Sequence, residues 1–139
     1  MHSLKKLVYC MISITAISVV QFKAVCHEPV AVLMLEYVYF DLSVFGGEGK
    51  VSSLKEFISY LDTGNCNGVD TNFMTRIASD IGSGLLYLHE RGIAHRDLKI
   101  ANVLVSNHHY REEKNRDKIA YPWSHEPVIC KLTDLIWRK

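Results

Sequence analysis

Apolar residues recur at every third or fourth position between residues 73 and 91. This spacing places them along one side of an α-helix, so the pattern predicts a helix there with a single buried stripe. Gly92 follows directly and supplies a C-terminal stop. Gly82 and Gly84 lie inside the helix, where glycine costs up to about 1 kcal/mol relative to alanine, so we expect both to mark close packing. The stripe consists of Phe73, Ile77, Ile81, Leu85 and Leu88.

A second, shorter helix is predicted from residue 54 to about residue 61. The sequence Ser-Leu-Lys-Glu over 53–56 has the spacing of a capping box, in which the serine and the glutamate satisfy backbone groups at the start of a helix. Leu54, Phe57, Ile58 and Leu61 then fall on one helical face. Gly64 provides the stop.

Three further apolar stretches predict strands. Residues 31–38 are almost continuously apolar, which favours a core strand covered on both faces. Residues 103–105 and 128–132 predict two shorter strands. The polar insertion between them, 106–127, carries mixed charges and is interpreted as a solvated loop, with a docking surface as the alternative.

The N-terminal residues allow two interpretations. Lys5 and Lys6 precede an apolar run, 7–20, in the order that is typical of a secretory signal. The run is too short to cross a bilayer comfortably and continues directly into globular-looking sequence, so we favour a buried strand or helix. We therefore divide the chain into an apolar N-terminal segment, 1–18, and one domain, 19–139.

Composition and charge exclude disordered, collagen-like and disulfide-dense classes of protein. The chain of 139 residues is 48% hydrophobic and 22% charged, as ordinary globular domains are. A formal net charge of +1 provides no field that would attract nucleic acid or an acidic membrane, so we expect no nucleic-acid partner and no membrane association.

Cysteine and histidine spacing predicts neither a zinc site nor a disulfide framework, because the cysteines lie far apart with no CxxC pair. Buried free thiols are expected instead. The only histidine pair, His108 and His109, has no cysteine or carboxylate beside it at ligand spacing, so we do not assign it a metal. The four cysteines are Cys10, Cys26, Cys66 and Cys130.

One segment carries chemistry. Residues 95–102 read His-Arg-Asp-Leu-Lys-Ile-Ala-Asn and match the catalytic loop of protein kinases at every fixed position. The flanks agree, since 84–89 resembles the long helix that precedes this loop in the family and 102–105 resembles the strand that follows it. The chain therefore resembles a protein kinase, over roughly residues 19–134.

The resemblance implies transfer of a phosphoryl group from ATP to a protein substrate. It makes Asp97 the catalytic base that accepts the hydrogen bond of the substrate hydroxyl, and Lys99 the group that stabilises charge on the phosphoryl oxygens. It makes Asn102 a magnesium ligand and Asp134 a second one, because hard cations prefer oxygen ligands. The lysine two residues after Asp97 makes the motif similar to that of the serine/threonine or tyrosine-kinase-like class of kinases. His95 would be a packed core residue.

Upstream residues resemble the nucleotide-binding part of the family. Residues 20–26 look like a small-lobe strand, and 33–38 look like the strand that enters the hinge. On that correspondence Leu35 is the gatekeeper, and the main chains of Glu36 and Val38 hydrogen-bond the adenine. Leu104 forms the floor beneath it. The expected fold is α+β: the end of a small lobe, a hinge, and the first helices and catalytic loop of a large lobe.

The pattern departs from the family at both ends. The family's Asp-Phe-Gly is Asp134-Leu135-Ile136 here, and β-branched isoleucine resists backbone angles that glycine adopts. We find no Gly-rich loop or Val-Ala-Ile-Lys lysine before the hinge, and no activation segment after Asp134. We therefore expect an incomplete kinase domain that transfers no phosphate at a measurable rate by itself.

Two alternatives remain open for the chain. It is either part of an active serine/threonine kinase or a catalytically inactive fragment that binds nucleotide or a protein partner. We expect ATP and Mg²⁺ as ligands and a cytoplasmic location. Cleavage near Ala24 would instead indicate a secreted or membrane-associated protein.

Overall fold

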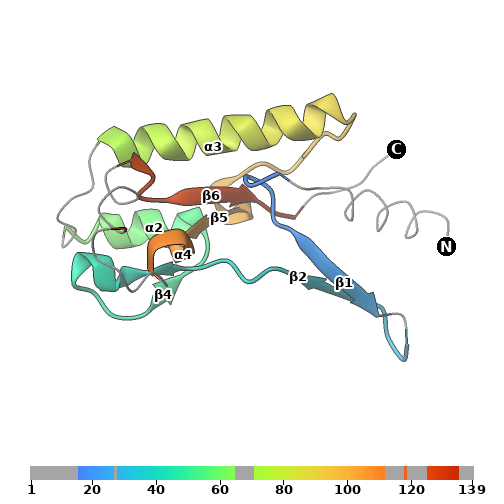
Figure 1. Ribbon diagram of the computed structural model, residues 1–139, viewed down its shortest axis with the longest axis horizontal. Coiled ribbons are helices and arrows are strands. Elements are labelled where there is room, and N and C mark those ends of the chain that lie inside the picture. Colours follow the sequence, from blue (N-terminus) through green and yellow to red (C-terminus); the bar gives the residue numbers. More distant parts are fainter. Residues whose placement is uncertain (1–15, 27, 65–70, 112–117, 119–124, 135–139) are drawn as a thin grey trace.

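The computed structural model describes residues 16–26, 28–64, 71–111, 118 and 125–134. It is a mixed α+β structure, as predicted, with three separate two-stranded antiparallel sheets. The long helix lies over the sheet nearest the C-terminus, while one hairpin projects away from the body (Figure 1). The elements in order are β1 (Phe22–Cys26), β2 (Val32–Leu35), β3 (Phe40–Asp41), η1 (Leu42–Phe45), β4 (Lys50–Val51), α2 (Leu54–Leu61), α3 (Thr71–Glu90), η2 (Ile100–Asn102), β5 (Val103–Ser106), α4 (His108–Arg111) and β6 (Ile129–Leu132).

Helix α3 confirms the long predicted helix and packs against β6. A side chain at Gly84 would place its Cβ 2.8 Å from the Ser18 carbonyl oxygen and 2.9 Å from Leu132 Cδ1, so the predicted close packing is confirmed there. The prediction of close packing is wrong for Gly82, because no atom outside its own stretch of helix lies within 4 Å of an added Cβ. The helix ends before Gly92, whose positive φ of 72° glycine adopts without strain.

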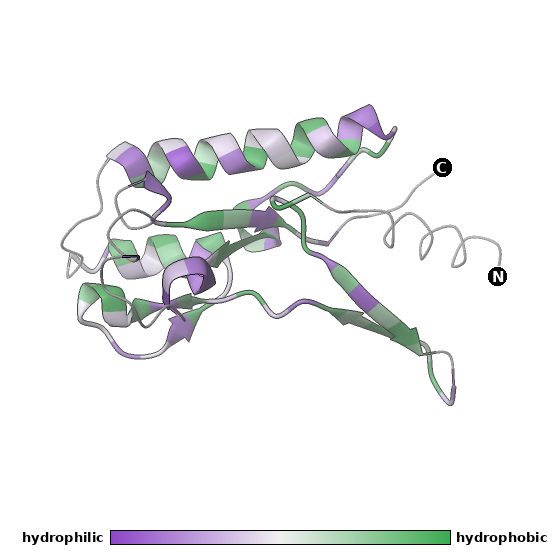
Figure 2. Ribbon diagram, in the orientation of Figure 1, coloured by the Kyte–Doolittle hydropathy of each residue, from purple (hydrophilic) through white to green (hydrophobic). Residues whose placement is uncertain are grey.

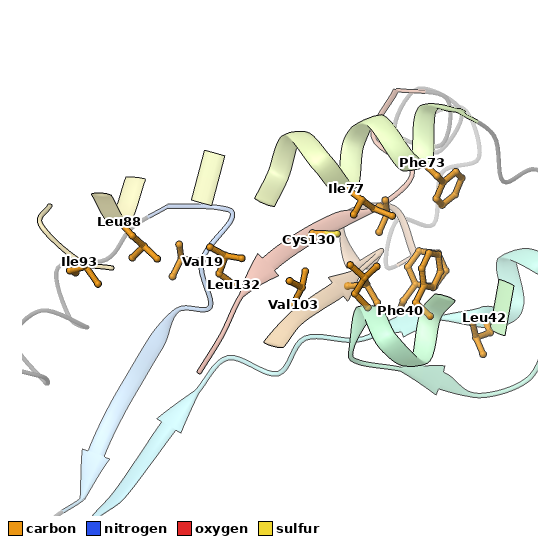
Figure 3. Packing of buried hydrophobic residues seen from close by; sticks show 14 residues of the cluster. Val19, Phe40, Leu42, Phe73, Ile77, Leu88, Ile93, Val103, Cys130 and Leu132 are labelled. Atoms are coloured by element: carbon orange, nitrogen blue, oxygen red, sulfur yellow. The ribbon is translucent and has the colours of Figure 1, made fainter. Parts of the chain in front are cut away.

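The predicted strands β5 and β6 form one antiparallel ladder, in which Val103 pairs with Leu132 and Leu104 with Lys131. One face of this ladder is fully buried, and the other is half-buried. Burial alternates along β6 and over Val103–Val105 of β5 because successive side chains point to opposite faces, while Ser106 at the end of β5 is buried as well. Figure 3 shows the buried face within the core. It consists of Val103, Val105, Cys130 and Leu132.

Helix α2 begins as predicted. Ser53 Oγ accepts a hydrogen bond from the Glu56 N–H at 3.1 Å, and the Glu56 carboxylate accepts from the Ser53 N–H at 3.3 Å, so the capping box is confirmed. The helix packs against β5 and η2 and buries Phe57. Phe57 belongs to an aromatic cluster in and beside the core, in which ring centroids lie 4.8 to 6.4 Å apart. Such separations are typical of favourable aromatic contacts.

The expectation of a core strand over residues 31–38 is half wrong. The strand exists as β2, but it pairs only with β1 and all four of its residues are exposed, with Met34 60% exposed. The hairpin is strongly apolar and extends away from the helices, so a two-stranded sheet has no layer to cover it (Figure 2). Only Val38, beyond the strand, is buried as predicted.

The first part of the insertion 106–127 is not a solvated loop. Asn107 is fully buried, and its amide exchanges two hydrogen bonds with the Asp41 backbone, at 2.9 and 3.0 Å. Tyr110 is buried as well, and its hydroxyl donates to the Pro127 carbonyl at 2.6 Å. Residues 112–117 and 119–124 lie outside the described part of the chain, so the docking-surface alternative stays a prediction.

The N-terminal prediction is only partly observed. Residues 1–15 lie outside the described residues, but Ser18, Val19 and Val20 are buried, and Val19 forms a parallel bridge with Leu132. Among the described residues, no helix is both long and apolar enough to span a membrane. Nor do three or more histidine, cysteine, aspartate or glutamate side chains of those residues form a group that could hold a metal ion.

The two described cysteines differ in burial. Cys130 is a buried free thiol, as expected, whereas Cys26 is exposed on the hairpin and contradicts the expectation. The reason is that β1 shares the exposed position of β2. Cys10 and Cys66 lie outside the described residues.

Candidate active site

The predicted catalytic loop connects α3 to β5 and is anchored by a buried histidine. His95 is 2% exposed, as predicted. Its Nε2 lies 2.7 Å from the Thr133 carbonyl oxygen, and its Nδ1 accepts a hydrogen bond from the Asp97 N–H at 3.3 Å. These two contacts require a neutral ring that carries its proton on Nε2. The ring thus ties the loop to the residue that follows β6.

The loop turns through a left-handed residue. Arg96 has a φ of 63°, a conformation that costs a non-glycine residue about 1–2 kcal/mol. Strained residues of this kind persist where the surrounding structure over-determines them, and they cluster at active sites. Here the buried His95 on one side and the buried Asn102 on the other hold the segment.

Three of the predicted catalytic residues lie together. The Asn102 amide is 4% exposed and donates hydrogen bonds to the Asp97 carbonyl oxygen and to Asp97 Oδ2, both at 2.9 Å. Lys99 Nζ lies 3.8 Å from the same Oδ2. The Asp97 side chain remains 41% exposed, so one carboxylate oxygen is oriented by the protein while the group stays accessible to a ligand.

The fourth predicted residue, Asp134, lies two residues after the end of β6. The Thr133 N–H donates to the Asn102 carbonyl at 3.1 Å, which fixes the chain one residue before Asp134. Asp134 itself is exposed and adopts a left-handed φ of 56°. Leu135 and Ile136, which replace the phenylalanine and glycine of Asp-Phe-Gly, lie outside the described part of the structure.

The residues of this site fit a magnesium ion. The amide nitrogen of Asn102 is occupied by two hydrogen bonds, so its oxygen is the atom that can ligate a cation, and Asp134 supplies a carboxylate. Mg²⁺ is commonly bound by one or two protein oxygens together with water and substrate phosphates. A small set of oxygen ligands beside an open surface is therefore sufficient.

Three of the predicted nucleotide residues, Leu35, Glu36 and Val38, lie between the end of β2 and the start of β3, and the fourth, Leu104, lies in β5. Leu35 ends β2 and is 39% exposed, Val38 is buried, and Leu104 lies on the half-buried face of β5. The Glu36 N–H donates to the Gln21 carbonyl at 2.9 Å, which leaves the Glu36 carbonyl as its main-chain group for a ligand.

Sequence analysis missed the side chain of Glu36. Its carboxylate binds Lys131 Nζ on β6 at 2.8 and 2.9 Å. The two residues are 95 positions apart, and nothing in the local sequence pattern relates them. The pairing of Asn107 with the Asp41 backbone was missed for the same reason.

The largely buried carboxyl group of Asp80 links α3 to β6. Burial raises the pKa of Asp80, although its hydrogen bond from the Cys130 N–H and its ion pair with Arg76 act in the opposite direction. Burial, with the Asp80 charge, also raises the pKa of the Cys130 thiol to about 12. Cys130 is therefore a neutral packing residue and no nucleophile.

Comparison with known proteins assigns the family. The protein kinase domain model matches residues 8–121. The Xenopus tropicalis protein named inhibitor of nuclear factor kappa-B kinase subunit alpha is 49% identical over 41 residues, which are 30% of this chain and 6% of that protein. The Girardia tigrina tyrosine-protein kinase SPK-1 is 34% identical over 89 residues, 64% of this chain and 16% of that protein.

Solved structures agree on the fold. A crystal structure of the Rad53 kinase domain and SCD2 superposes with a TM-score of 0.60 at 20% identity, over 97% of this chain and 39% of that chain. Rad53 1–466 in complex with AMP-PNP gives a TM-score of 0.58 over 98% of this chain and 28% of that one. This chain spans only a small part of each relative. The fold is a partial protein-kinase fold, and the chain belongs to the protein kinase domain family.

Proposed function

We propose that this site transfers the γ-phosphoryl group of ATP to serine or threonine hydroxyls of a protein substrate. The observation that carries the proposal is the double hydrogen bond from the buried Asn102 amide to Asp97, with Lys99 beside the same carboxylate. The family match supports the class of reaction. One relative named as a probable serine/threonine-protein kinase and one named as a dual serine/threonine and tyrosine protein kinase support the choice of hydroxyl.

Asp97 is proposed to orient the attacking hydroxyl. Asn102 and Lys99 both contact Oδ2, so Oδ1 is the oxygen that accepts the hydrogen bond of the hydroxyl. As the hydroxyl oxygen forms its bond to phosphorus, the bond to the ADP oxygen breaks and ADP leaves with the electron pair. The hydroxyl proton passes to Asp97. Lys99, which is largely exposed, stabilises the charge on the phosphoryl oxygens.

The nucleotide and metal are assigned to the remaining residues. Asn102 and Asp134 would hold Mg²⁺, which neutralises phosphate charge when bound. The main chains of Glu36 and Val38 would hydrogen-bond the base beside Leu35 and above Leu104. ATP as phosphate donor is consistent with the proposed cytoplasmic location.

One observation favours an alternative function. Asp134 is followed by leucine and isoleucine where the family has phenylalanine and glycine, and it already adopts a left-handed backbone. A site that still binds nucleotide but does not align the phosphoryl group would act as a nucleotide-binding or protein-interaction module. Transfer activity separates the two functions.

The test measures labelled phosphate transfer to a mixed peptide library by the longest product of the gene that contains this chain. Label is expected on serine and threonine, and Asp97→Asn is expected to lower the rate at least about a hundredfold, the usual contribution of a positioned base. Lys99→Ala is also expected to lower the rate, and Lys55→Ala, which removes an exposed lysine on α2, is its matched control. Absence of transfer, with Mg²⁺-dependent AMP-PNP binding retained, would establish the alternative.

A further inference from the structure

Two charged side chains join the β1–β2 hairpin to β6. Glu36 directly follows β2, and both oxygens of its carboxylate accept hydrogen bonds from Lys131 Nζ, at 2.8 and 2.9 Å. Glu36 Oε1 also accepts the Gln21 N–H at 2.8 Å. The carboxylate therefore receives three hydrogen bonds that draw together the hairpin's two strands and β6.

This contact differs from an ordinary surface ion pair. The side chains of Lys131 and Glu36 are only 18% and 19% exposed, so water screens their attraction weakly. The Lys99–Asp97 pair, by comparison, is 3.8 Å long and far more exposed. Because the apolar residues of β2 are themselves exposed, packing contributes little to holding this part of the hairpin in place.

Lys131 is also placed beside the predicted floor of the nucleotide site. It pairs across the ladder with Leu104, and directly paired residues of an antiparallel sheet present their side chains on the same face. The ion pair therefore spans the space between the segment 35–38 and Leu104. Figure 1 shows the hairpin leaving the body beside the end of β6. Lys131 is three residues before Asp134.

We propose that Glu36 and Lys131 are positioning residues for a purine base: their ion pair sets the distance between the main chain of 35–38 and Leu104. The inference rests on the proposed nucleotide site and extends it to two side chains that do not touch the nucleotide. A base fits between the main-chain groups and the leucine only when that spacing is maintained. Loss of the ion pair leaves the groups present but misplaced, which weakens binding of the base.

The experiment measures binding of two probes to the purified chain by calorimetry: adenosine, which reports the base site, and Mg²⁺ with inorganic tripolyphosphate, which reports Asn102 and Asp134. Glu36→Gln and Lys131→Met are each expected to weaken adenosine binding about tenfold or more, with tripolyphosphate binding unchanged. A purely structural role would weaken both probes equally. Glu28→Gln, which is exposed on the same hairpin, serves as the matched control for Glu36→Gln, and Lys55→Met, which is exposed on α2, serves as that for Lys131→Met.

The charge-reversed double variant, Glu36→Lys with Lys131→Glu, gives the second readout. Restoration of adenosine affinity to within about threefold of the wild type supports a specific coupling between the two residues. Unchanged adenosine affinity in the single variants, or an equal loss for both probes, overturns the positioning role. A wild-type chain that binds neither probe refutes the nucleotide site itself. In that case amide hydrogen exchange still reports the ion pair, because the Gln21 N–H should exchange more slowly in the wild type than in Glu36→Gln.

Discussion

The catalytic loop and the β1–β2 hairpin are attached to the rest of the structure in opposite ways. The catalytic loop, residues 95–102, is mostly polar, yet buried His95 and Asn102 attach it to the body of the structure. The hairpin is strongly apolar, yet β2 is exposed along its whole length. A polar network can therefore anchor a segment more firmly than apolar composition does when no second layer covers it.

This difference determines which residues control stability and which control function. Side chains beneath the loop belong to a close-packed core, in which the loss of a few atoms leaves a cavity. Side chains on the hairpin already contact water, so their removal changes little in the folded state. Substitutions matched in chemistry but placed in the two regions test this distinction.

The largest effect is expected for Leu88→Ala. Leu88 is completely buried on α3, so its truncation should lower the free energy of unfolding by about 2–5 kcal/mol. Leu33→Ala removes the same atoms from exposed β2 and should change it by less than about 0.5 kcal/mol. Urea unfolding of both variants measures the contrast. Similar losses for the two leucines would show that β2 is covered in solution.

A smaller effect is expected for Gly84→Ala. The added methyl group would lie 2.8 Å from the Ser18 carbonyl oxygen, and overpacking of this kind costs about 1–3 kcal/mol. Gly82→Ala adds the same group to open space in the same helix, where alanine is favoured over glycine by up to about 1 kcal/mol. Thermal unfolding should therefore shift in opposite directions for the two variants, and a shared direction would refute the observed contact between α3 and residues 18 and 132.

The smallest effect concerns pH. Burial raises the pKa of Asp80 above its ordinary value of 3.8, so the folded chain retains this proton to higher pH than the unfolded chain. The stability contributed by the protonated form is complete below 3.8 and is lost as the pH rises through the folded-state pKa. The unfolding free energy of the wild type minus that of Asp80→Asn should fall across that window. A flat or rising difference in urea titrations contradicts the assignment.

Local sequence patterns predicted the elements well but not their surroundings. The capping box at Ser53 and the apolar stripe of α3 are specified by neighbours within a turn or two, so their positions followed from the sequence. The exposure of β2 depends on whether another layer packs on it, which periodicity does not encode. The pairing of Glu36 with Lys131 joins positions 95 residues apart, beyond the range of any local rule.

In the candidate site too, local motifs predicted the residues, whereas long-range contacts were not predicted. Asp97, Lys99 and Asn102 were predicted from one continuous motif, and the structure brings them together. The position of Asp134 depends on the hydrogen bond between Thr133 and Asn102, which the sequence does not specify.

The central claim is that Asn102 and Asp97 form one side of a metal-nucleotide site, and paramagnetic broadening by Mn²⁺ tests it most directly. With AMP-PNP present, Mn²⁺ should broaden the side-chain amide NMR signal of Asn102 strongly. It should affect buried Asn107 less, because that residue lies five positions away, just beyond the far end of strand β5. Broadening that is equal at both asparagines, or absent at Asn102, would contradict the account.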